Sequence, residues 1–128
     1  MGKKKRVPAQ TASMVHDGKL TQAEALEALR IAAQAATEAL PAALKQCQTD
    51  SERSKVQADR DTVMLAYLNS LKKTLVNTGA LFENMAEDLK KVAKDVAEKA
   101  EKLKNASEAI NLLADLVRLA ASLALAFA

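Results

Sequence analysis

Apolar residues recur three or four positions apart along most of this chain, and this spacing sets the tightest limit on its fold. Side chains three and four apart line one face of an α-helix, so the spacing predicts helices with one apolar stripe. Most of these residues are Ala and Leu, which are strong helix formers, and aromatic residues make up only 2% of the chain. The sequence therefore predicts an all-α protein. The first stripe consists of Leu26, Leu29, Ala33, Ala36, Leu40, Ala43 and Cys47.

Two capping signals place the first helices. The letters TQAE at 21–24 form a capping box, in which a threonine hydroxyl and a glutamate each bond the backbone of the other residue. This box predicts a helix over about 21–47, kinked by Pro41 because proline removes a backbone hydrogen bond. The letters TDSE at 49–52 form a second box and predict the start of the next helix.

Two turn signals divide the rest of the chain. Gly79 can end a helix and Asn105 can begin one, so turns are expected near both residues. Four helices joined by short turns predict an antiparallel four-helix bundle over residues 21–128. The apolar spacing also stays in phase through both turns, so an extended coiled-coil helical hairpin is the alternative. After the second box, the expected core stripe begins with Met64, Leu68, Leu71 and Leu75.

Residues 1–20 carry most of the net positive charge. They hold five basic residues against one acidic residue, whereas the remainder holds fourteen against fifteen. This stretch lacks periodicity and is predicted to be a flexible basic arm. Its cluster is expected to contact an anionic surface, with lipid preferred to nucleic acid because the body is nearly neutral and poor in aromatic residues. The cluster consists of Lys3, Lys4, Lys5 and Arg6.

The chain finishes on LADLVRLAASLALAFA, residues 113–128, whose only charged members are Asp115 and Arg118. A membrane-spanning helix needs about 20 apolar residues, and the uncharged run after Arg118 has ten. The segment is therefore expected to pack within its own bundle or against another molecule. The residues predicted to form an intermolecular surface are Leu112, Leu116, Leu119, Leu123 and Phe127.

Few residues suggest chemistry. The single histidine, His16, lies in the arm, and the single cysteine, Cys47, occupies the first apolar stripe, where a buried side chain is expected. Acidic pairs at helical spacing fall on the polar faces, and the chain has no phosphate-binding glycine loop and no Glu-x-x-His pair. We therefore expect no catalytic residue, cofactor or metal. The acidic pairs are Glu24 with Glu27 and Glu83 with Glu87.

These observations predict a non-enzymatic structural or protein–protein interaction bundle that self-associates through its apolar C-terminal helix. The partner would be a second copy or another helical protein. The alternative is a membrane-active or membrane-localising helical domain that uses the basic arm and the amphipathic C-terminal helix. No apolar stretch of a signal peptide follows MGKKKR. The sequence thus leaves open whether the protein is cytoplasmic or secreted by a non-classical route.

Overall fold

The computed structural model describes residues 19–128, so the predicted basic arm, apart from Lys19 and Leu20, lies outside them. The first helix, α1 (Gln22–Gln46), begins at the first capping box. The Glu24 N–H donates to Thr21 Oγ1 at 3.1 Å, and the Thr21 N–H donates to Glu24 Oε1 at 2.9 Å. Helix α1 continues through Pro41 and is capped by Cys47, so the expected bounds of this helix are confirmed.

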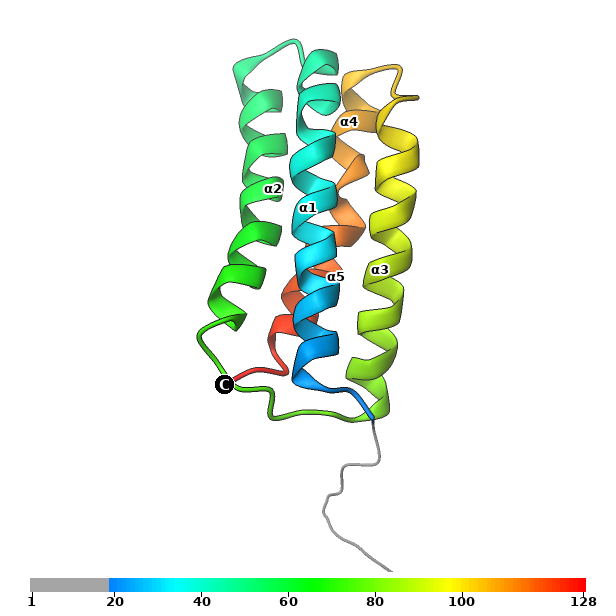
Figure 1. The fold of residues 1–128 in the computed structure, drawn as a ribbon. Helices are drawn as coiled ribbons and strands as arrows, with labels where there is room; N and C mark the ends of the chain where they lie inside the picture. The colour runs from blue at the N-terminus through cyan, green and yellow to red at the C-terminus, as the bar shows by residue number, and fades with distance from the viewer. Residues whose placement is uncertain (1–18) are drawn as a thin grey trace, which may run out of the picture.

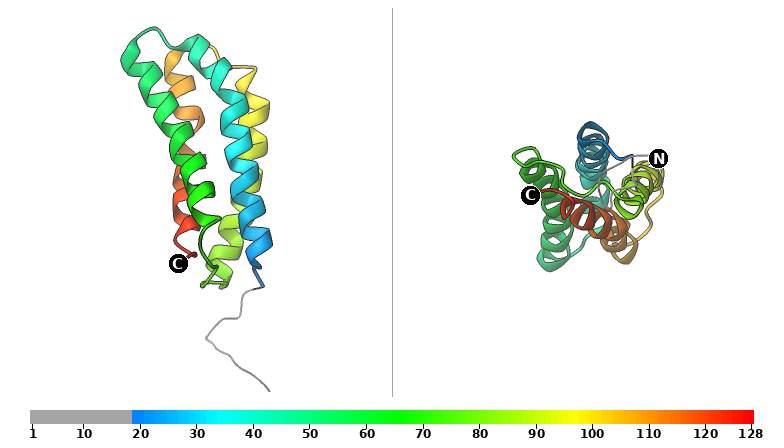
Figure 2. Two further views of the ribbon diagram at one scale, coloured as in Figure 1. Left: turned by 60° about the vertical axis from the view of Figure 1, so that its left-hand side comes forward. Right: turned by 90° about the horizontal axis from the view of Figure 1, so that it is seen from below.

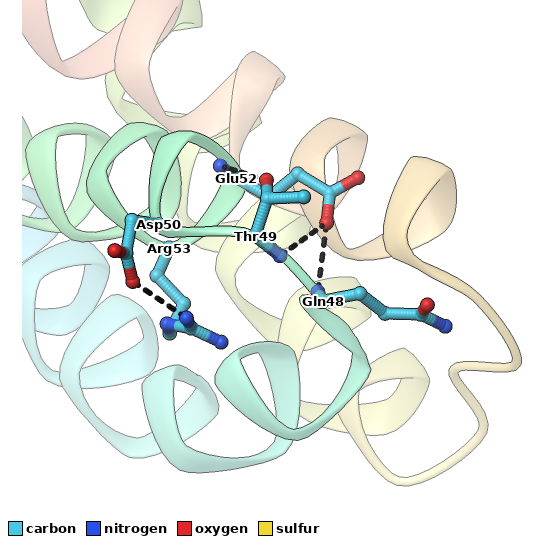
Figure 3. Close-up of polar contacts among 5 residues, drawn as sticks. All are labelled: Gln48, Thr49, Asp50, Glu52 and Arg53. Carbon is cyan, nitrogen blue, oxygen red and sulfur yellow. Dashed lines mark hydrogen bonds and ion pairs between the residues drawn. The ribbon is translucent and has the colours of Figure 1, made fainter.

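Helix α2 (Asp50–Ser70) begins at the second capping box, shown in Figure 3. The Glu52 N–H donates to Thr49 Oγ1 at 3.1 Å. In return, Glu52 Oε1 accepts from the backbone N–H groups of Gln48, at 2.7 Å, and Thr49, at 3.1 Å. Three backbone N–H groups at the turn from α1 to α2, which have no partner within a helix, are therefore hydrogen-bonded by side chains of the same five residues.

The second helix ends earlier than the sequence predicts. Helix α2 stops at Ser70, and residues 71–79 form a connection that leads to α3 (Ala80–Ala100). The turn near Asn105 is confirmed, because Asn105 caps α4 (Ala106–Leu112) with its side chain. One helix was expected after this turn, but it is divided at Leu113, where α5 (Ala114–Ala124) begins.

Helix α5 follows α4 along one side of the bundle, so these two short helices together take the place of its last helix (Figure 1). Helices α1, α2, α3 and the α4–α5 pair run in alternating directions, as expected for the bundle, and the chain does not form the extended coiled-coil hairpin. Viewed along the bundle, α2 and α3 occupy opposite corners and their backbones do not come close, while α1 and α5 each lie between them (Figure 2). The connection from α2 to α3 therefore crosses one end of the bundle, and α1 lies beside α3 in a parallel orientation.

The core is centred on α1, which packs against all the other helices. Its core face is made almost entirely of alanine, whose small side chain lets neighbouring helices approach closely. Larger side chains from the other helices, such as Leu89 and Leu116, fill the space between them. The buried alanines of α1 are Ala25, Ala28, Ala32, Ala33, Ala35, Ala36, Ala39 and Ala43.

The last three residues of the chain hold the α2–α3 connection in place. The Thr74 N–H donates to the Ala128 carbonyl at 3.0 Å, and the Ala128 N–H donates to the Thr74 carbonyl at 2.9 Å. The Val76 N–H donates to the Ala126 carbonyl at 2.8 Å. These bonds are β-like and join residues about fifty positions apart, which fixes the connection against the C-terminus (Figure 1).

Candidate functional site

The C-terminal apolar residues singled out from the sequence are mostly inside the bundle. Leu116, Leu119, Leu123 and Phe127 are buried, because α5 packs between α2 and α3. Leu112 is half-buried beside the end of α3. A surface that meets a second molecule must therefore use other side chains while the bundle stays folded. The basic cluster Lys3, Lys4, Lys5 and Arg6 lies outside the described residues.

The large apolar side chains that are exposed gather at one end of the bundle. Across residues 19–128, all six lie in the last part of α2, in the α2–α3 connection, at the start of α3 or after α5. Figure 1 shows these segments at the lower end of the molecule, where the C-terminus lies. We call this region the apolar end. Its members are Leu65, Leu68, Leu71, Val76, Leu81 and Leu125, between 42% and 74% exposed.

Helix α2 contributes part of the apolar end on its outer face. Its core face consists of Val56, Val63 and Ser70, which recur every seven residues and are buried. Leu65 and Leu68 lie on the opposite side of the helix and face solvent, since positions two and five residues after Val63 point away from it. The expected core stripe through Leu68 and Leu71 is therefore wrong.

The spacing of seven was visible in the sequence and could have identified this face. Val56 and Val63 lie seven apart and have no other large apolar residue between them. The leucines after Met64 give a stronger apolar stripe, which predicts the other face of α2 as the core face. Helix α2 carries two apolar faces in its second half, one inside and one outside.

Charged side chains surround the apolar end. Lys19, Lys72 and Lys73 are all exposed there, at the start of α1 and just after α2. Asp61 lies one turn before Leu65 on the same outer side of α2, and its carboxylate accepts from Arg60 Nε at 2.8 Å. The Asp61 side chain remains 58% exposed, so it is open to a further partner.

A second concave region lies between the end of α3 and α4. It is an open groove of about 430 Å³, lined by both acidic and basic side chains, among them Asp95, Lys99 and Glu108. Within residues 19–128, no group of three or more His, Cys, Asp or Glu side chains is placed to hold a metal ion. The groove contains no arrangement of acid, base and nucleophile that we would assign to a reaction.

Cys47 is buried at the end of α1, as the sequence predicts. Its Sγ donates to the Ala43 carbonyl at 3.4 Å. Burial raises the pKa of the Cys47 thiol above its ordinary value, which disfavours the reactive thiolate. The side chain therefore acts as a small apolar residue of the core.

No helix within the described part of the chain combines the length and the apolar character that crossing a bilayer requires. Comparisons with known proteins assign no relative. The chain matches no family model, no curated protein and no solved structure. The candidate site is thus defined by its own geometry, and it is the apolar end of the bundle.

Proposed function

We propose that this chain is a non-enzymatic interaction module that self-associates through the apolar end of its helical bundle. The observation that supports this most directly is the distribution of exposed leucine and valine. All six large exposed apolar side chains in residues 19–128 share one end, and the rest of the described surface has none. Apolar side chains gathered in this way are typical of a surface that meets another protein.

The apolar end is also held in a fixed shape, which favours binding. Leu65 and Leu68 lie on the regular helix α2. Val76 lies in the α2–α3 connection and Leu125 just after α5, and hydrogen bonds join these two segments. A rigid surface loses little conformational entropy when it binds.

Sedimentation velocity over a concentration series of about 10 µM to about 1 mM tests self-association, because this range covers weak dimers. We expect the sedimentation coefficient to rise with concentration for the natural chain. We expect it to stay constant when Leu65, Leu68, Leu81 and Leu125 are changed to Ser. A control variant changes the exposed Ala97 and Ala114 to Ser, away from this end, and should behave as the natural chain does. A natural chain that stays monomeric throughout would contradict the proposal.

Association with an anionic membrane surface is a second candidate, favoured by the position of the lysines. Lys19, Lys72 and Lys73 are exposed at the same end as the six apolar side chains. Cationic and apolar side chains together are typical of proteins that lie on anionic lipid. Flotation with vesicles of phosphatidylserine and phosphatidylcholine at low salt tests this. The expected result is co-flotation that is lost with pure phosphatidylcholine, and absence of binding to both would exclude this candidate.

A further inference from the structure

The outer face of α2 carries two leucines flanked by opposite charges. Asp61, Leu65, Leu68 and Lys72 follow one another at intervals of four, three and four residues, so they form one stripe along the helix. Helix α2 ends at Ser70, but the backbone continues into a further turn, in which the Lys72 N–H donates to the Asn69 carbonyl at 3.2 Å. All four side chains are exposed. We call this set the α2 stripe.

The α2 stripe is complementary to itself when one copy is reversed. The midpoint between Leu65 and Leu68 is also the midpoint between Asp61 and Lys72. A two-fold axis at that midpoint therefore places Leu65 of each copy against Leu68 of the other copy. It also places Asp61 of each copy against Lys72 of the other copy. An interface with two-fold symmetry needs this kind of self-complementary patch.

We propose that two copies of this chain pair through an antiparallel contact between their α2 helices. Leu65 packs against the partner's Leu68, and Asp61 forms an ion pair with the partner's Lys72. This inference rests on the proposed self-association and names its partner, surface and orientation. A parallel contact would instead place Asp61 against the partner's Asp61 and Lys72 against the partner's Lys72, which is repulsive.

The position of α2 in the bundle leaves room for this contact. Helix α2 occupies a corner, with α1 and α5 on either side and α3 at the opposite corner (Figure 2). The ion pair of Asp61 with Arg60 uses one carboxylate oxygen, Oδ1, and a carboxylate accepts several hydrogen bonds, so an amino group can join it.

The contact is short, so the dimer is weak. From position 61 to position 72 the stripe extends roughly 16 Å at about 1.5 Å per residue. Interfaces below about 1,200 Å² are typical of transient complexes. The dimer therefore forms at high protein concentration and is sensitive to single charge changes.

Two single charge reversals test the pairing without touching the leucines. Asp61→Lys places two lysines against each other in both halves of the homodimer, and Lys72→Asp does the same with two aspartates. We expect each variant alone to dimerise about tenfold or more weakly than the natural chain, since two attractive pairs become repulsive. An equal mixture of the two variants restores opposite charges at both contacts, so we expect a heterodimer as strong as the natural dimer.

The matched control uses α3, where Asp88 and Lys99 are also exposed and eleven residues apart but have no exposed leucines between them. Asp88→Lys and Lys99→Asp, alone or mixed, should leave dimerisation unchanged. Sedimentation equilibrium measures all the samples, and circular dichroism checks that each variant is folded. A natural dimer that is insensitive to the reversals at 61 and 72 would overturn the pairing but not self-association, whereas a monomeric natural chain would overturn both.

Disulfide trapping tests the orientation in a Cys47→Ser background. We expect a mixture of Asp61→Cys and Lys72→Cys chains to form a disulfide-linked heterodimer, because an antiparallel contact brings these positions together. Each variant alone should not cross-link, since identical positions lie roughly 16 Å apart and a disulfide needs Cα atoms within about 7 Å. Cross-linking of each variant alone, without the heterodimer, would show a parallel contact and overturn the proposal.

Discussion

Thr49 is the residue whose local role is best defined, because it accepts the Glu52 N–H at the start of α2. We expect Thr49→Ala to lower the free energy of unfolding by about 1 kcal/mol, the usual cost of removing a helix N-cap. Thr62→Ala is the matched control, since the Thr62 hydroxyl only donates to the Ala58 carbonyl of its own helix. Thr62→Ala should leave the free energy of unfolding unchanged or raise it slightly, because alanine is the better helix former. Urea unfolding measures both, and equal losses would contradict the capping role.

Glu52 makes the same turn sensitive to acid. Hydrogen bonds from the Gln48 N–H and the Thr49 N–H hold the pKa of the Glu52 carboxyl below its ordinary value. A lowered pKa in the folded state contributes stability above the ordinary pKa, and this contribution is lost as the pH falls through the lowered pKa. We expect Glu52→Gln, which keeps an acceptor oxygen but does not titrate, to lose less stability than the natural chain between neutral and acidic pH. Urea unfolding at both pH values measures this, and parallel losses would contradict it.

At the scale of the elements, the C-terminal segment is predicted to fix the α2–α3 connection. Phe127 is buried against the connection and forms a β-bridge with Leu75. We expect Phe127→Ala to lower the free energy of unfolding by about 3 kcal/mol, as for other buried aromatic side chains. Leu125, two residues away, is 74% exposed. Its change to Ala should alter stability by less than about 0.5 kcal/mol, as is usual at exposed positions. Thermal unfolding measures the stability of both variants, and similar losses of stability in the two would contradict this role of Phe127.

The elements also show which structural signals a sequence carries. The bounds of α1 could be predicted because the capping box at Thr21 acts over three residues. The end of α2 could not, because residues 71–79 are held by Gln22 and by residues 126–128, which are distant in the chain. No local pattern records such bonds. The break at Leu113 likewise interrupts an apolar pattern that predicts one helix.

The candidate site was harder to predict than the fold. The sequence indicated an apolar interaction surface near the C-terminus, and Leu125 does lie in the apolar end. Four of the five positions predicted for that surface, Leu116, Leu119, Leu123 and Phe127, are instead buried in the bundle. The predicted core face of α2 is the wrong one, since a helix with two apolar faces gives two competing patterns.

At the scale of the whole molecule, the crossing of the α2–α3 connection brings the apolar residues together. Leu71 and Leu81 come from helices at opposite corners, and Leu125 follows the helix between them. The connection and the C-terminus bring all three to the same end of the bundle. The apolar end as a whole is therefore a product of the bundle's topology, although the α2 stripe within it lies along one helix.

The central claim is that the outer face of α2 is where two copies meet. A dilution series followed by two-dimensional amide NMR tests it most directly, because each backbone N–H reports its own surroundings. On concentration from about 20 µM to about 1 mM, a range suited to weak dimers, we predict shifts at residues 61–72 and constant positions at residues 88–99. Shifts at residues 88–99 alone, or none anywhere, would contradict the claim.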